Sequence, residues 1–366
     1  MKTPKLKSPS KTGDMTMLVV GDIFVQRDDP PSVFGHVRDT LLDADFLLGN
    51  LEGSVSDSGS PWSLKETNWK ADARQVSAVH SASFDAVSVA NNHMLDFGYD
   101  ALFETLGHLD RHEIGHSGGG HNFEEAHKPA IVEHNGCRVA LLAYTSVFMS
   151  DWAAGPSTPG LAVMRARTAY EAPRRVHEVP GTPPIIRTWM VQEDKDQLTL
   201  DIEKARMQAD IVVCSFHWGI SRGHREIVDY QIELGHHAVD SGADLVFGHH
   251  PHVIQGVEVY RDTPIFYSLG NFTFAQHNLL KGHELETMII KCHIQDRQIV
   301  SFEYLPIRGD EATNPQLVNL EAADDIVDLV SKRSSRFKTK FLPLETSIKV
   351  VTNGVSIDKE KIVVPT

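Results

Sequence analysis

Short runs of apolar residues, each bounded by turn residues, alternate along the chain with stretches in which apolar residues return every three to four positions. The short runs predict strands at 17–20, 46–48, 86–89, 131–133, 139–144, 211–216, 245–247 and 265–267. The periodic stretches predict helices at 33–42, 71–81, 99–111, 198–209 and 227–240. Strands that alternate with helices are typical of an α/β layered fold.

Two regions depart from this alternation. Residues 151–188 are rich in Pro, Gly, Ser and Arg, and they predict a long loop inserted beside the fold. The insertion is locally basic, so it is either a solvated linker or a clamp for an anionic substrate. Beyond residue 274, apolar and polar residues alternate at 288–294 and 299–304, which predicts an antiparallel pair of strands. A helix at 322–331 and a strand at 348–351 follow.

The length of 366 residues fits one large α/β domain or two ordinary ones. We expect a disordered tail at 1–14, a domain at 15–310 that carries the insertion, and a C-terminal extension at 311–366 that packs on this domain.

The formal charge of −14 opposes binding to nucleic acid or anionic lipid. No apolar run approaches the ~20 residues of a membrane-spanning helix. Three scattered cysteines favour reduced thiols and a cytoplasmic location, and no pattern fixes the oligomeric state.

Five of the predicted strands run directly into polar clusters, which end at Asp22, Glu52, His93, His217 and His252. A lone Asp or His after a strand is usually a cap or a hydrogen-bonded turn residue. In open α/β sheets, however, ligands bind outside the carboxyl ends of the strands, so five such clusters predict one shared site. Carboxylate, amide and imidazole donors together suit Zn, Mn, Fe or a pair of such ions.

The clusters belong to an ordered set of motifs: G-D at 21–22, N-L-E at 50–52, N-N-H-x-x-D-x-G at 91–98, H-W-G at 217–219, G-H-H-P-H-V-x-Q at 248–255 and S-L-G-N-F at 268–272. Over residues 17–274 this set resembles the CapA, or poly-γ-glutamate capsule biosynthesis, family, which lies within the calcineurin-like metallophosphoesterase superfamily. The resemblance implies a four-layer αββα sandwich with a dinuclear metal centre at the strand ends.

The metal ligands that the resemblance implies are Asp22, Glu52, Asn92, His217, His250 and His252. Asp22 and His252 would bind the first metal, and Glu52 would bridge the two. Asn92, His217 and His250 would bind the second metal, with His249 as the alternative to His250. The chain departs from the D-x-H start of superfamily phosphoesterases because Phe24 stands where the histidine would be, so the first site lacks one imidazole.

Further roles follow from the same resemblance. His93 would face the substrate as an acid or electrostatic stabiliser, and Asp96 would either orient His93 or cap the helix that follows. The candidate substrate-binding residues are Lys70, His224, Arg225 and His249. For His224 and Arg225, the alternative is an ordinary place on the surface.

The function that these features predict is hydrolysis of an amide bond, γ-glutamyl or another C–N bond, in a small anionic substrate. Two divalent ions, Mn, Zn or Fe, would activate the attacking water. Amide hydrolysis is preferred because the family's named context is a γ-linked amide polymer and because the missing D-x-H histidine departs from the phosphatase pattern. The alternatives are a metallophosphoesterase and a non-catalytic scaffold that binds polymer during capsule biosynthesis. Neither nucleic acid nor a membrane is an expected partner.

Overall fold

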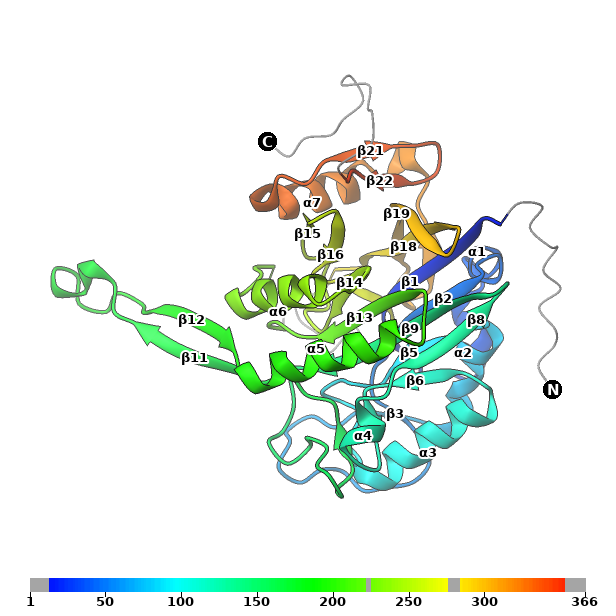
Figure 1. Ribbon diagram of the computed structural model, residues 1–366, viewed down its shortest axis with the longest axis horizontal. Helices are drawn as coiled ribbons and strands as arrows, with labels where there is room; N and C mark the ends of the chain where they lie inside the picture. The colour runs from blue at the N-terminus through cyan, green and yellow to red at the C-terminus, as the bar shows by residue number, and fades with distance from the viewer. Residues whose placement is uncertain (1–12, 222–224, 276–283, 353–366) are drawn as a thin grey trace.

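The computed structural model describes residues 13–221, 225–275 and 284–352, and over these ranges a pair of large β-sheets face each other (Figure 1). All eight strands predicted for the N-terminal three quarters of the chain overlap an observed strand. No helix among the described residues is both long and apolar enough to cross a bilayer. The strands form the centre of the molecule, and helices cover their outer faces.

The first sheet has ten strands, eight of which lie in one continuous order. That order is β21 (Phe341–Pro343), β22 (Ile348–Val350), β19 (Gln298–Gly309), β18 (Glu286–Gln295), β1 (Met15–Phe24), β2 (Phe46–Leu51), β5 (Ala86–Ser88) and β6 (Gly115–Ser117). The other two strands are β17 (Asn271–Phe274), parallel to β1, and β20 (Pro315–Leu317), antiparallel to β19. The strands β1, β2, β5 and β6 are parallel, so their carboxyl ends share one edge.

The second sheet has six strands in the order β15 (Val257–Tyr260), β16 (Thr263–Phe266), β14 (Leu245–His249), β13 (Ile211–His217), β9 (Cys137–Thr145) and β8 (Ala130–His134). Its four central strands are parallel, and the outer strands β15 and β8 are antiparallel to their neighbours. Parallel strands that are buried on both faces appear in a sequence as continuous apolar runs. This explains why β13 and β14 are recognisable in the sequence.

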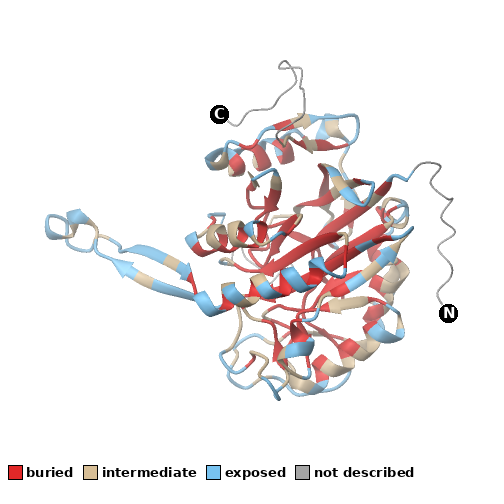
Figure 2. Cartoon of the chain, in the orientation of Figure 1, coloured by how far each residue is buried: buried red, intermediate tan, exposed pale blue. Residues whose placement is uncertain are grey.

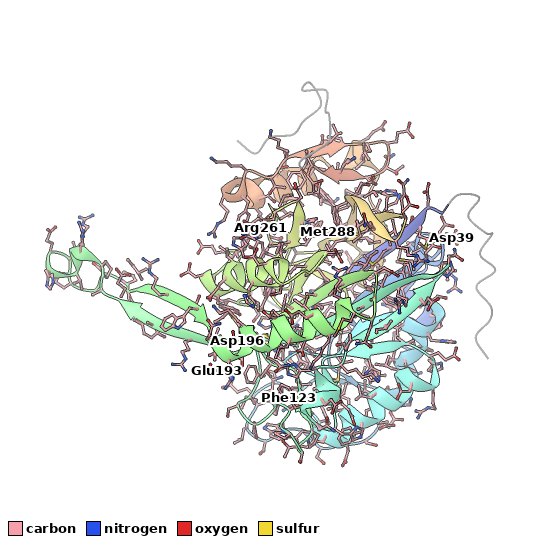
Figure 3. All side chains as sticks on the ribbon, viewed as in Figure 1. Asp39, Phe123, Glu193, Asp196, Arg261 and Met288 are labelled. Atoms are coloured by element: carbon pink, nitrogen blue, oxygen red, sulfur yellow. The ribbon has the colours of Figure 1, made fainter. Side chains whose placement is uncertain are left out.

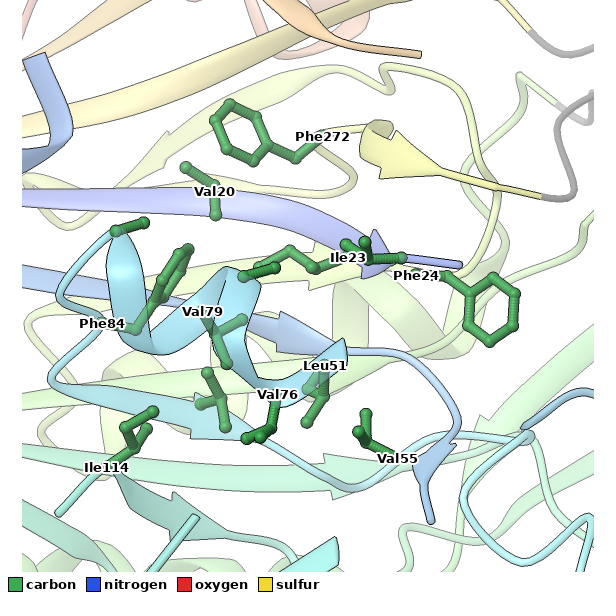
Figure 4. Close-up of a cluster of buried hydrophobic side chains, with 14 of the residues drawn as sticks. Val20, Ile23, Phe24, Leu51, Val55, Val76, Val79, Phe84, Ile114 and Phe272 are labelled. Carbon is green, nitrogen blue, oxygen red and sulfur yellow. The ribbon is translucent and has the colours of Figure 1, made fainter. Parts of the chain in front are cut away.

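Alternate side chains of β1 point into different layers. Met17 and Val19 pack in the core between the two sheets, together with residues such as Val213 and Phe247 of the second sheet. Leu18 and Val20 point to the other face, where helices cover the first sheet. Figure 4 shows that helix-covered face, with Val20, Val79, Phe84 and Phe272 in one cluster.

Helices cover both outer faces of the sheet pair. α1 (Arg38–Leu42), α2 (Val76–Ser81) and α3 (Gly98–Arg111) pack on the first sheet, and α5 (Gln192–Arg206) and α6 (Asp229–Asp240) pack on the second. α7 (Asp324–Ser334) contributes Ile326 and Val330 to the core between the sheets. α4 (Phe123–Ala126) and the 3₁₀ turns Pro30–Phe34, Ala73–Gln75, Arg174–His177, Leu320–Ala322 and Ser335–Phe337 complete the elements. The layers are helix, sheet, sheet and helix, so the predicted αββα sandwich is confirmed.

The predicted insertion at 151–188 contains strands and is not one continuous loop. β10 (Gly160–Leu161) pairs with β7 (Gly119–Gly120), and β11 (Ala166–Glu171) pairs with β12 (Ile185–Met190) in an antiparallel hairpin. Figures 1 and 2 show this hairpin extending from the body with mostly exposed residues. Prolines dominate only its tip, whereas β12 is rich in β-branched and aromatic residues that favour strands.

Three helix predictions are wrong at their starts. The predicted helix at 33–42 is split into a 3₁₀ turn and α1, and the one at 71–81 begins as the short strand β4 (Lys70–Ala71), which pairs with β3 (Ser54–Val55). α5 begins at Gln192, six residues before the predicted start, because polar residues fill its first turns. Near the C-terminus, β20 and β22 extend the first sheet through β19.

We predict that Gly248→Ala destabilises the protein by about 3 kcal/mol, because a Cβ atom at this position would lie 2.1 Å from Trp218 Nε1 and 2.2 Å from the Tyr267 carbonyl oxygen. Urea unfolding followed by circular dichroism measures this change. The control is Gly107→Ala inside α3, where the nearest atom is the flexible end of Arg111 at 3.4 Å. This control should stabilise the protein by about 0.5–1 kcal/mol. Equal effects of the two substitutions would contradict the packing argument.

Candidate metal centre

The predicted ligands converge because the two sheets bring the carboxyl ends of their parallel strands to one edge of the sandwich. Asp22 lies near the end of β1, where the pairing register shifts, and Glu52 directly follows β2. Asn92 lies in the turn after β5, and His217 ends β13 in the other sheet. Asp22, Glu52 and His217 are at most 1% exposed. Donors separated by almost 200 residues therefore share one buried site.

Two groups of donors are compact enough for one cation each. Asp22, His217 and His249 form the first group, and Asp22, Glu52 and His252 form the second; within each group the donor atoms lie within 4.8 Å of one another. Asp22 Oδ1 lies 3.7 Å from His249 Nδ1, and Asp22 Oδ2 lies 3.4 Å from His252 Nδ1. Asp22 thus belongs to both groups, whereas Glu52, the bridge that the resemblance implies, belongs to one.

Negative charge on the carboxyl groups of Asp22 and Glu52 would be poorly compensated. Burial raises the pKa of Asp22 to about 6, against the opposing effect of the hydrogen bond from Asn50 Nδ2 to Asp22 Oδ1 at 2.7 Å. Burial also raises the pKa of Glu52 well above its usual value, and the neighbouring charge of Asp22 adds to this rise. Among the described residues, neither Oε atom of Glu52 accepts a hydrogen bond.

A divalent cation fits this arrangement. Buried charges are normally paired or coordinate a metal, and the oxygens of Glu52 lack the donors, within the described chain, that would otherwise stabilise them. His252 Nε2 lies 3.6 Å from Glu52 Oε1, so an imidazole and a carboxylate face the same space. Mixed nitrogen and oxygen donors of this kind bind Zn, Mn or Fe.

A chain of hydrogen bonds orients the imidazoles of His217 and His249. Ser215 Oγ lies 2.7 Å from His249 Nε2, His249 Nδ1 lies 2.7 Å from His217 Nδ1, and His217 Nε2 lies 2.8 Å from Asn92 Oδ1. The chain is satisfied when Ser215 donates to His249, His249 donates to His217, and His217 donates to Asn92. Both imidazoles are then neutral, in agreement with burial, which lowers the pKa of each well below its usual value.

The ligand role that the resemblance implies for His250 stays a prediction. His250 belongs to neither donor group, although its ring centroid lies 4.7 Å from that of His217. Its backbone N–H donates to Asp22 Oδ2 at 3.3 Å. His250 and His252 both have positive φ angles, 97° and 58°, a backbone conformation that residues other than glycine rarely adopt. His249 ends β14 and His252 lies in the strained turn that follows, and a ring nitrogen of each lies within 4 Å of Asp22.

His93 and Asp96 form a second unit beside these donors. His93 Nδ1 lies 2.6 Å from Asp96 Oδ2, which also accepts the backbone N–H of Trp69 at 2.7 Å. The indole of Trp69 stacks on the His93 ring with centroids 4.0 Å apart. Lys65 donates to the Asn92 carbonyl and to Asp96 Oδ1, and its Nζ lies 3.0 Å from His93 Nδ1. Burial is the main cause that lowers the pKa of His93.

Among the described candidate substrate residues, Lys70 and Arg225 make contacts away from the two donor groups. Lys70 Nζ donates to the Ser58 carbonyl at 2.8 Å and lies over the Phe97 ring. Arg225 is exposed and pairs with Glu284, with Nη2 and Oε1 2.8 Å apart. His224 lies outside the described residues. The substrate-binding roles of these three residues stay predictions.

Lys65 contacts the His93–Asp96 unit, and the sequence does not reveal it. It lies in the polar segment between β3 and β4, which has no helical or strand period, so no pattern points to it. The family resemblance indicates Lys70, five residues later, as the basic residue of this segment. Asn271, at the start of β17, has the sequence signature of a turn residue, yet its Oδ1 lies 2.8 Å from His252 Nδ1.

We predict that Glu52→Gln stabilises the metal-free protein by about 1–2 kcal/mol, because it removes a buried carboxylate beside Asp22. Thermal unfolding in EDTA measures this gain. Added Mn²⁺ or Zn²⁺ should raise the Tm of the wild type, since binding to the native state stabilises it, and raise that of the variant less.

The matched control is Glu203→Gln, an exposed position on α5. It should leave both the metal-free Tm and the metal-induced rise unchanged. If Glu52→Gln lowered the metal-free Tm, the carboxylates would not be the uncompensated pair described above.

We predict that Lys65→Met costs about 3 kcal/mol, because it leaves the fully buried Asp96 carboxylate without its cation. Urea unfolding measures the loss. The double variant Lys65→Met with Asp96→Asn should recover much of it, because the unpaired charge is gone. If the double variant lost the sum of the unfolding free energies lost by the two single variants, Lys65 and Asp96 would not act as a pair.

Known proteins resemble this chain over most of its length. The model of the family described as "Bacterial capsule synthesis protein PGA_cap" matches residues 12–276. The PGA biosynthesis protein CapA of Bacillus subtilis is 29% identical over 85% of this chain and 76% of its own length. The capsule biosynthesis protein CapA of Bacillus anthracis is also 29% identical, over 82% of this chain and 68% of its own length.

Among solved structures, the calcineurin-like phosphoesterase YfkN of Bacillus subtilis is similar with a TM-score of 0.38 and 12% sequence identity, over 83% of this chain and 90% of that chain. The family match covers well over half of the chain, including every residue of the two donor groups and the His93–Asp96 unit. The resemblance to CapA proteins seen in the motifs is thereby confirmed, and the chain belongs to the bacterial capsule synthesis PGA_cap family.

Proposed function

We propose that this protein is a metal-dependent hydrolase that cleaves an amide bond of a small anionic substrate. One observation carries the proposal: a buried set of carboxylates and imidazoles, with Asp22 common to two donor groups, lies beside an oriented His–Asp pair. Cation binding and proton transfer are the two requirements of hydrolysis by an activated water. The same residues have no evident role in packing, since apolar side chains at these positions would cost less to bury.

Asp22, Glu52, His217, His249 and His252 would hold two divalent ions, Mn, Zn or Fe. Asn92 and His250, which the resemblance also implies as ligands, lie next to His217 and would complete the set. Bound ions of this kind lower the pKa of a coordinated water and polarise the bond that is attacked. The hydrogen bond from Asn50 fixes the Asp22 carboxylate, and the contact of Ser215 with Nε2 fixes the His249 ring, so both side chains are oriented before a cation arrives. A cation bound at His249 Nδ1 would take the place of the hydrogen bond between His249 and His217.

His93 would move the proton. Asp96 accepts from Nδ1–H, which leaves Nε2 as the atom that can take a proton from water and return it to the leaving nitrogen. The new C–O bond forms as the C–N bond breaks, and the products are a carboxylate and an amine. Stacking on Trp69 and the hydrogen bond to Asp96 keep the ring in one orientation. The lowered pKa of His93 keeps it neutral near pH 7, as a proton acceptor must be.

The substrate class comes from the relatives. The Bacillus subtilis relative is named for PGA biosynthesis, and the family resemblance concerns poly-γ-glutamate, whose repeating bond is an amide and whose side groups are carboxylates. A γ-glutamyl amide is therefore the substrate that we propose. A phosphoester would suit the same cations, and it is the competing outcome of the assay below.

We predict that the purified protein, loaded with Mn²⁺ or Zn²⁺, releases amine from a panel of γ-glutamyl amides. His93→Ala should lower kcat by about 10²–10⁴-fold, because proton transfer is lost, while the metal-induced rise in Tm persists. Amine release measured by fluorescence and phosphate release from an aryl phosphate are followed in parallel.

The control variant is His236→Ala, which removes an imidazole from α6 that pairs with Glu258. It should leave turnover unchanged. Phosphate release without amine release would replace the amide by a phosphoester. Metal binding without turnover of either panel would contradict hydrolysis and favour a scaffold.

A further inference from the structure

The hairpin of β11 and β12, with its flanking residues 165–190, forms an arm that stands apart from the sandwich (Figure 1). Within the described chain these two strands pair only with each other, so neither outer edge is paired with another strand. A two-stranded hairpin in water is marginally stable and needs a further surface to pack against. Open edges and exposed apolar residues are also sites of association between chains.

The register divides the arm into two unlike faces. One face carries no charge and consists of Ala166, Thr168, Tyr170, Ile186, Thr188 and Met190. Tyr170 and Ile186 lie directly opposite each other on this face and are 72% and 58% exposed. The opposite face carries Arg167, Arg187 and Glu171, of which Arg187 and Glu171 form an ion pair. The most exposed apolar pair of the arm therefore lies on the uncharged face.

The arm also has opposite charges at its two ends. At the tip, Arg174, Arg175, His177 and Glu178 are all exposed, so the basic residues outnumber the acidic one. At the base, Arg165 is paired with Asp194 and Arg167 lies on the charged face. Glu193 and Asp196 are exposed on α5 beside them, as Figure 3 shows near the junction of the arm and the body. The uncharged face continues onto the start of α6, because the Tyr230 N–H donates to Thr188 Oγ1 at 3.1 Å. Asp229 is exposed one residue before this contact.

We propose that two copies of this chain form a dimer in which the two arms pack against each other through their uncharged faces. A two-fold axis across the uncharged face packs Tyr170 and Ile186 of one copy against the same residues of the other. It also runs the two arms in opposite directions, so that the basic tip of each reaches the acidic base of its partner. A surface that is apolar in the middle and carries opposite charges at its ends complements itself under this symmetry.

An anionic surface is the competing occupant. Residues 165–190 contain five arginines and two glutamates in a chain whose formal charge is −14, so the arm would attract acidic lipid or polymer. A lipid-binding element presents its apolar and basic groups to the same surface. Trp189, which is 42% exposed, shares the face of the arginines, but the more exposed pair of Tyr170 and Ile186 lies on the other face. A second copy of the chain would cover the uncharged face and would also pair the basic tip of each arm with the acidic base of the other.

Sedimentation equilibrium from 1 to 100 μM tests the proposal with two neighbouring isoleucines. Ile186→Glu, on the uncharged face, should weaken the dimer by more than about tenfold, because it buries a carboxylate against its own copy. Ile185→Glu places the same charge on the opposite face, where the isoleucine is 39% exposed, and should leave association unchanged. Thermal unfolding confirms that both variants keep the fold.

Charge reversal gives a second measurement. Arg174→Glu with Arg175→Glu should weaken the dimer in low salt, and adding Glu193→Arg with Asp196→Arg should restore it. A wild-type chain that stays monomeric at 100 μM would overturn the proposal, and so would equal association of the two isoleucine variants. Binding of the monomer to phosphatidylserine vesicles, lost in Ile186→Glu, would assign the arm to a membrane surface instead.

Discussion

The constraint on which the site depends is the burial of two neighbouring carboxylates, Asp22 and Glu52, at the edge of an apolar sandwich. Each would be stable as an anion only near positive charge, and the ammonium group of Lys65, which acts on Glu52, already binds Asp96. Among the described residues, Asp22 faces the imidazoles of His217 and His249, and burial lowers the pKa of each well below its usual value. This environment disfavours bare anions and favours a cation between them.

The fold creates this constraint by bringing together the ends of two sheets. β1 and β2 carry the carboxylates and β13 and β14 carry the imidazoles, and each strand is held in place by the core between the sheets. The packing at Gly248, where backbone and indole approach closely, ties the turn after β14 to this core. Rigid strands thus support donors whose own backbone, at His250 and His252, is strained.

The metal centre and the arm differ in burial, rigidity and polarity. The centre is buried, rigid and polar, and its residues are held by hydrogen bonds such as those from Asn50 and Ser215. The arm is exposed, narrow and partly apolar, and within the described chain only its base packs on the body, through Thr188 and Met190. Changes in the arm can therefore alter association without disturbing the donors.

The sequence alone determined the strands, the layered fold and the polar residues at the strand ends, because these depend on local periodicity and on motifs such as N-L-E and N-N-H. The tertiary structure decided which histidines of G-H-H-P-H face Asp22, because positive φ angles at His250 and His252 break the alternation that predicts side-chain direction. It also decided the place of Lys65, whose contacts with Asn92 and Asp96 span 27 and 31 residues. Such contacts arise only from packing, which leaves no periodic signal in the chain.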